Sequence, residues 1–171
     1  MASGVNSRRI FIDMINNDIY RRLRYLFGYQ YDHVQALFQS TGFEISEEQY
    51  KGWARKEEED RFIHMTDREL AIFLNGVIIK MRGARPGPPP VPEEEMSNNV
   101  ILRKLKIAFN LRSEEMIEVF GLVDRKLSPH ELSAFFRKPS HSSFRYVKGQ
   151  YLRNFLMGLQ MKYKSSLSQA K

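Results

Sequence analysis

The sequence predicts an all-α protein made of two tandem copies of a four-helix orthogonal bundle unit, joined by a proline-rich linker. Two observations support this prediction. The chain aligns with itself without a gap when residues 16–82 are placed on residues 98–164. Within each copy the apolar residues follow helical spacing, and no alternating pattern typical of strands occurs.

The internal repeat is found by shifting the sequence against itself by 82 residues. Sixteen of the 67 aligned positions are identical, whereas roughly 4 identities are expected by chance at average composition. A shared set of apolar positions indicates a shared fold, because buried side chains determine how helices pack. The matched pairs of structural type include Ile19 with Ile101, Leu23 with Leu105, Phe27 with Phe109, Phe73 with Phe155, and Gly76 with Gly158.

The first two helices of each unit are predicted from their apolar faces. The first begins near Asn17 or Asn98, and from Ile19 onward it carries apolar residues at i, i+4, i+7 and i+8. The second covers about Asp32–Ser40 in the first copy and Glu114–Leu122 in the second.

The third and fourth helices are predicted from capping signals. The third opens with a capping box at residues 46–49 and again at residues 128–131, where Pro129 takes the first helical position. The fourth opens with a capping box at residues 66–69, runs to Arg82 and ends at Gly83.

The proline-rich segment divides the chain into its predicted parts. Five prolines fall within residues 86–92, and they fix φ and remove backbone donors, so an extended spacer is expected. We therefore predict a first repeat at 14–83, a linker at 84–97, a second repeat at 98–164 and a C-terminal tail at 165–171. Because each unit alone is small, we expect the two repeats to pack against each other.

Several motifs resemble those of one bacterial family. The segments Asn16-Asn17-Asp18-Ile19, Trp53-Ala54-Arg55-Lys56-Glu57 and Phe73-Leu74-Asn75-Gly76 resemble the first half of the YehS family of small bacterial proteins. Residues 98–109 and 155–159 are similar to its second half. The resemblance implies a tandem helical protein without an established activity, so it supplies no catalytic residues. Family members begin just before the Asn-Asn-Asp-Ile motif, which makes residues 1–13 an N-terminal extension or a vector remnant.

The composition limits the cellular setting and the chemistry. The chain has no cysteine, which excludes disulfides and thiolate metal sites and favours a reducing, cytoplasmic location. The longest apolar stretch, Leu70 to Ile79, is too short to cross a bilayer, so no membrane partner is expected.

No catalytic or cofactor-binding pattern is recognisable. The four histidines show no metal-ligand spacing, and neither a glycine-rich phosphate loop nor a nucleophile elbow occurs. The acidic run at residues 57–60 is interpreted as a solvated face, because consecutive carboxylates point in different directions. We therefore expect a protein that is not an enzyme and that has no metal, catalytic site or cofactor.

The excess of positive over negative charge lies in the second repeat. The chain carries a net charge of +7, yet residues 16–82 hold 10 Lys and Arg against 11 Asp and Glu, while residues 98–164 hold 13 against 5. An acidic partner is therefore expected at the second repeat, either DNA or RNA or an acidic protein segment. The predicted nucleic-acid-binding residues are Arg103, Lys104, Lys106, Arg112, Lys126, Arg137, Lys138 and Arg145.

Two binding modes remain open from the sequence. The second and third helices, about Asp32–Lys56 and Glu114–Lys138, resemble a helix-turn-helix with an over-long turn, whose last helix would enter the DNA major groove. An ordinary orthogonal bundle shows the same pattern. The alternative is a protein-interaction or regulatory module, in which a groove between the repeats receives an acidic or helical segment.

Overall fold

A computed structural model describes residues 14–169 of the chain, and this part is helical without any strand. The first repeat contains α2 (Asn16–Phe27), α3 (Tyr31–Ser40), α4 (Glu47–Ala54) and α5 (Asp67–Arg82). The second repeat contains α6 (Asn98–Ala108), α7 (Ser113–Gly121), α8 (Pro129–Ala134) and α9 (Gly149–Gln169). The all-α prediction with four helices per repeat is confirmed. Residues 165–169, expected as tail, continue α9, while the extension at 1–13 lies outside the described residues.

The predicted capping signals set the starts of three helices. The hydroxyl of Ser46 accepts a hydrogen bond from the N–H of Gln49 at 3.1 Å, and the hydroxyl of Ser128 accepts one from the N–H of Glu131 at 3.1 Å. Thr66 caps α5 in the same way, and α5 ends at Gly83, whose φ is 85°. These bonds satisfy backbone donors that a helix start leaves without partners.

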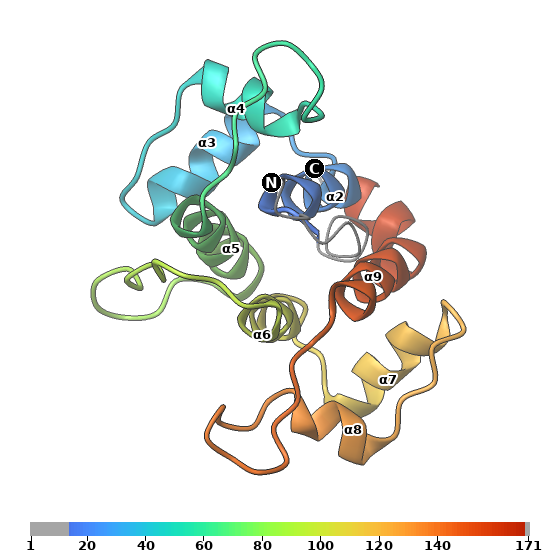
Figure 1. The fold of residues 1–171 in the computed structure, drawn as a ribbon. Coiled ribbons are helices and arrows are strands. Elements are labelled where there is room, and N and C mark those ends of the chain that lie inside the picture. Colours follow the sequence, from blue (N-terminus) through green and yellow to red (C-terminus); the bar gives the residue numbers. More distant parts are fainter. Residues whose placement is uncertain (1–13, 170–171) are drawn as a thin grey trace, which may run out of the picture.

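The two repeats pack around an approximate two-fold axis, with the first helix of each repeat against the last helix of the other. Helix α2 packs against α9, and α5 packs against α6, so these four helices form the centre of the molecule (Figure 1). The pairs α3/α4 and α7/α8 lie at opposite ends (Figure 1). A shift of 82 residues carries α2 onto α6 and α5 onto α9, so each inter-repeat contact is the counterpart of the other. The equivalent residues Phe27 and Phe109 stack with ring centroids 5.7 Å apart, which is expected at such an axis.

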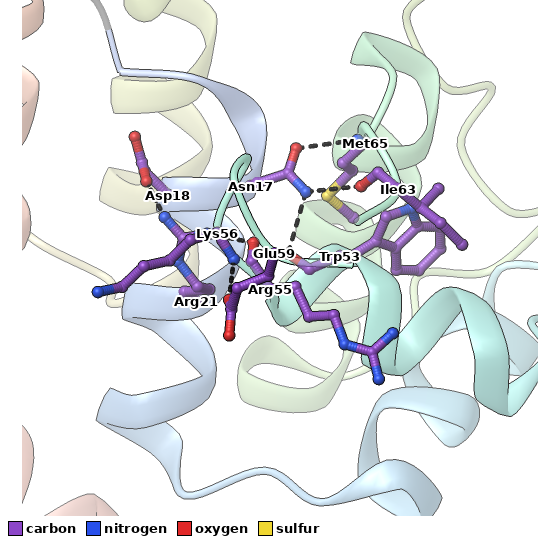
Figure 2. A network of polar contacts seen from close by, with 9 residues as sticks. All are labelled: Asn17, Asp18, Arg21, Trp53, Arg55, Lys56, Glu59, Ile63 and Met65. Carbon is purple, nitrogen blue, oxygen red and sulfur yellow. Dashed lines mark hydrogen bonds and ion pairs between the residues drawn. The ribbon is translucent and has the colours of Figure 1, made fainter. Parts of the chain in front are cut away.

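A buried asparagine joins three segments of the first repeat. The Nδ2 group of Asn17 donates to the carbonyl of Trp53 at 3.0 Å and to that of Ile63 at 2.8 Å, and its Oδ1 accepts from the N–H of Met65 at 2.9 Å (Figure 2). Asn17 is fully buried. One side chain on α2 therefore fixes the end of α4 and the loop that leads into α5.

The second repeat contains the same arrangement. Asn99 donates to the carbonyls of Phe135 at 2.9 Å and Arg145 at 2.8 Å, and accepts from the N–H of Val147 at 3.0 Å. Every partner is the counterpart, 82 residues on, of a partner of Asn17. The long loops after α4 and α8 are thus held in one conformation by the same amide, although their sequences differ almost completely.

A close helix contact also recurs in both repeats. A Cβ added at Gly76 of α5 would lie 2.6 Å from the carbonyl oxygen of Leu37 in α3, and one at Gly158 of α9 would lie 2.3 Å from that of Val119 in α7. Only a residue without a Cβ allows these backbones to approach so closely. The identical glycines of the repeat are therefore explained by packing.

Replacing Asn99 with alanine is expected to destabilise the protein by about 2–4 kcal/mol, because two buried carbonyls and one buried N–H lose their partner. Urea unfolding measures the effect. Asn98→Ala is the matched control: Asn98 makes a single half-buried bond, to the carbonyl of Val147, and its loss should cost about 1 kcal/mol. Equal losses for the two variants would contradict the role given to Asn99.

Gly158→Ala is expected to lower stability by about 2 kcal/mol or more, because the new methyl group forces α9 away from α7. Gly121→Ala serves as the control, since nothing lies within 4 Å of a Cβ at Gly121, and there a small gain from helix propensity is expected. Thermal unfolding of both variants, followed by circular dichroism, makes the comparison. A tolerated Gly158→Ala would show that the helices are not in tight contact.

Candidate functional site

Two basic side chains of the second repeat contact Phe136, and two more basic residues follow it in the chain. The guanidinium of Arg103 on α6 donates to the carbonyl of Phe136 at 3.3 Å, and the ammonium of Lys106 lies 5.6 Å from the centre of its ring. Arg137 and Lys138 follow Phe136 directly in the chain. We call Arg103, Lys106, Arg137 and Lys138 the Phe136 cluster.

Two elements position this cluster. Arg103 and Lys106 lie three residues apart on α6 and therefore share its outer face. Helix α8 ends at Ala134, and the next residue, Phe135, is buried. Phe136 and Arg137 are half-buried and Lys138 is exposed, and the bond from Arg103 to the carbonyl of Phe136 holds this segment beside α6.

In the first repeat, acidic residues accompany three of the four equivalent cations, while the fourth, Arg24, lies over the ring of Tyr50. Arg21 forms an ion pair with Asp18 and donates to the carbonyl of Arg55 at 2.7 Å (Figure 2). The backbone of Lys56 is bound by the carboxylate of Glu59 (Figure 2), within a run of four acidic residues at 57–60. Attraction between these groups leaves little positive potential there.

The second repeat lacks these counter-charges. Val100 replaces the acid at position 18, and residues 139–142 read Pro-Ser-His-Ser where the first repeat has Glu-Glu-Glu-Asp. The asparagine network holds the two loops in the same way, but the loops differ in charge. The Phe136 cluster therefore lacks the acidic neighbours that the equivalent residues of the first repeat have.

Two of the five acidic residues of the second repeat pair with cations outside the Phe136 cluster. Glu115 pairs with Arg112 at 3.6 Å, and Glu118 lies 3.9 Å from Lys162. The backbone N–H and the charge of Arg112 lower the pKa of Glu115. Arg112, one of the predicted nucleic-acid-binding residues, is thus exposed and paired with a carboxylate.

Lys104 does not lie on the basic surface. Its ammonium forms a 3.0 Å ion pair with Glu93 of the linker and a 2.6 Å hydrogen bond with Asn75 of α5, and only 11% of its side chain is exposed. The prediction that Lys104 contacts nucleic acid is corrected here. Because α6 packs against α5, the residue between the two outward cations points into the interface between the repeats.

The two remaining predicted residues are exposed. Lys126 lies in the loop between α7 and α8. Arg145 lies beside the end of α8, because its N–H donates to the carbonyl of Ala134 at 3.1 Å. Next to it the side chain of Tyr146 is 74% exposed. The sequence analysis identified neither Tyr146 nor Phe136. The segment between them has no helical or alternating apolar pattern that would show which rings are accessible.

The geometry differs from a helix-turn-helix in two respects. Helix α8 has 6 residues, which corresponds to about 9 Å of helix, and Arg137 and Lys138 follow this helix rather than lie on it. The connection between α7 and α8 spans residues 122–128, longer than the usual turn of this motif. The expected third helix is therefore present as α8, but it is shorter than expected and does not carry these two cations.

The fold and the duplicated asparagine network define a tandem-repeat helical protein, and the comparisons place it in a family. A family model described as "Protein of unknown function (DUF1456)" matches residues 16–83 and again residues 98–165. The chain is 35% identical over 147 residues to the uncharacterized protein YehS of Escherichia coli strain K12. The aligned region covers 85% of this chain and 94% of that protein. The chain therefore belongs to this family of YehS-like proteins, whose function is not established. No solved structure matches it significantly.

Residues 14–169 contain neither a cluster of metal ligands nor a membrane-spanning helix. No group of three or more His, Cys, Asp or Glu side chains is placed so that it could hold a metal ion. No helix has the length and apolar content needed to cross a bilayer.

Lys104→Glu is expected to lower the stability of the protein by about 2–4 kcal/mol, because it places a carboxylate against Glu93 in a partly buried interface. Arg103→Glu, one residue away on the exposed face, should change stability by less than about 1 kcal/mol. Urea unfolding of the two variants tests the different roles of these neighbours. A larger loss for Arg103→Glu would refute the placement of Lys104.

Proposed function

We propose that this protein binds nucleic acid through the second repeat, with the Phe136 cluster contacting the phosphate backbone. The observation that carries the proposal is the difference in acidic neighbours. In the first repeat Arg21 pairs with Asp18, and an acidic run directly follows Lys56, whereas the second repeat has no acid at the equivalent positions 100 and 139–142. Clustered Lys and Arg without acidic neighbours are the electrostatic feature that attracts polyphosphates. The proposed role is binding and not catalysis.

The proposed mode is backbone contact rather than reading of the major groove. Helix α8 is too short to insert deeply and carries none of the cluster's cations. The exposed ring of Tyr146 next to Arg145 offers a surface on which an unpaired base can stack. Preference for single strands over duplexes, with weak dependence on sequence, follows from this mode.

A second candidate is supported by a groove between the repeats. A cavity of about 820 Å³ lies where the linker passes over α5 and α6. Its lining combines apolar residues such as Ile78 and Ile107 with the basic residues Arg82, Arg85 and Lys106. Such a lining suits an amphipathic segment with acidic residues, as a protein-interaction module would bind.

Reversal of the Phe136 cluster tests the proposed function. In the variant with Arg103→Glu, Lys106→Glu, Arg137→Glu and Lys138→Glu, affinity for a fluorescent single-stranded oligonucleotide should fall at least 100-fold, because attraction becomes repulsion. For the wild-type protein, the logarithm of the association constant should fall with the logarithm of salt concentration with a slope of about −3 to −4, as expected for four phosphate contacts. Fluorescence anisotropy at several salt concentrations measures both quantities.

The first repeat supplies the matched control. Reversing the equivalent residues Arg55 and Lys56, which lie beside the acidic run, should leave binding within about 3-fold of the wild type, because their potential is already offset. Circular dichroism verifies that each variant is folded. Absence of binding by the wild-type protein at low salt, to both DNA and RNA, would overturn the proposal and favour the groove as the functional surface.

A further inference from the structure

A small cavity lies at the second contact between the repeats, where α2 packs against α9. Its volume is about 410 Å³, and its lining consists of Met14, Asp18, Arg21, Arg22 and Arg153. Three of these five residues are arginines, contributed by both repeats. The cavity lies on different helices from the Phe136 cluster, so it goes beyond the proposed function.

Two of the arginines have no ion-pair partner among the described residues, although the carboxylate of Asp18 lines the same cavity. The carboxylate of Asp18 is engaged by Arg21, which also donates to the carbonyl of Arg55. Within the described residues, neither Arg22 nor Arg153 has a hydrogen bond or an ion pair, and both are half-buried. Burial, followed by the positive charge of Arg153, lowers the pKa of Arg22. Two partly desolvated guanidinium groups that repel each other are unfavourable unless an anion lies between them.

The approximate two-fold axis supplies an internal reference for this cavity. The counterpart of Arg22 is Lys104, which at the α5/α6 contact pairs with the carboxylate of Glu93 at 3.0 Å. The counterpart of Arg153 is Ala71. One side of the axis therefore holds a single cation that pairs with a carboxylate from the linker. The other side holds three arginines and one carboxylate, Asp18, which pairs with Arg21.

We propose that the Arg22–Arg153 cavity binds the dianionic phosphate group of a small phosphomonoester. A phosphomonoester carries a charge between −1.5 and −2 at neutral pH, which matches the two free cations, whereas a carboxylate or a phosphodiester carries only −1. Guanidinium groups also suit phosphate geometrically, since their planar donors contact two oxygens at once. The cavity volume leaves room for a small organic group beside the phosphate.

Isothermal titration calorimetry of the full chain with inorganic phosphate, in a chloride buffer of constant ionic strength, tests the proposal. Saturable binding with one site is expected, while acetate at the same concentration should not bind. Arg153→Ala should weaken phosphate binding about 10-fold or more, in line with the loss of a charge-assisted hydrogen bond. This variant should fold, because alanine already occupies the equivalent position 71.

Lys80→Ala is the matched control, since it removes one positive charge from an exposed position of α5 and should leave phosphate binding unchanged. Lowering the pH from 7.5 to 5 should weaken the binding of phosphate, because inorganic phosphate changes from mainly dianion to monoanion over this range. The binding of sulfate, which stays doubly charged, should not change. A nucleoside monophosphate that binds more tightly than phosphate would identify an organic phosphomonoester as the ligand, whereas equal affinity would identify free phosphate.

Three results would overturn the proposal: no saturable binding of phosphate by the full chain, equal weakening by Arg153→Ala and Lys80→Ala, or the same pH response for sulfate and phosphate. The variant with the Phe136 cluster reversed separates this proposal from the proposed function. If the cavity binds phosphate, that variant should retain phosphate affinity while losing affinity for oligonucleotides.

Discussion

The fold of each repeat depends on one buried amide. Asn17 and Asn99 each join the first helix of their unit to the end of the third helix and to the loop before the fourth. A buried amide with three partners is favourable only when all three are present, because an unmatched polar group is costly away from water. This requirement fixes the course of two loops whose sequences share little else, and those loops carry the residues that distinguish the repeats.

Duplication with divergence explains how the surface charges arise. The scaffold positions, including the close-packed Gly76 and Gly158, are kept in both halves, since any change there disturbs packing. The exposed residues at 57–60 and 139–142 lie outside that constraint and differ in every position. The same backbone geometry therefore presents a neutral surface in one repeat and a basic surface in the other.

The approximate two-fold axis relates two interfaces between the repeats. Equivalent helices form both interfaces, but the charged side chains in them differ. At the α5/α6 contact the linker contributes Glu93 to Lys104. At the α2/α9 contact Arg22 and Arg153 line an open cavity. A monomer with two repeats can differentiate such paired sites, whereas a symmetric homodimer has to repeat every substitution at both. The basic surface and the arginine cavity are the two sites proposed to bind phosphate groups, and they lie on different helices.

The sequence by itself determined the all-α class, the repeat, the capping boxes and the location of the excess positive charge, because apolar spacing and local hydrogen bonds act over a few residues. Only the tertiary structure decided which cations are available. Lys104 belongs to the same helix as Arg103 and Lys106, yet the packing of α6 on α5 buries it. Helical periodicity does not reveal contacts between residues far apart in the chain. For this reason it did not show the contact of α6 with Phe136, the short length of α8 or the closeness of Arg22 to Arg153.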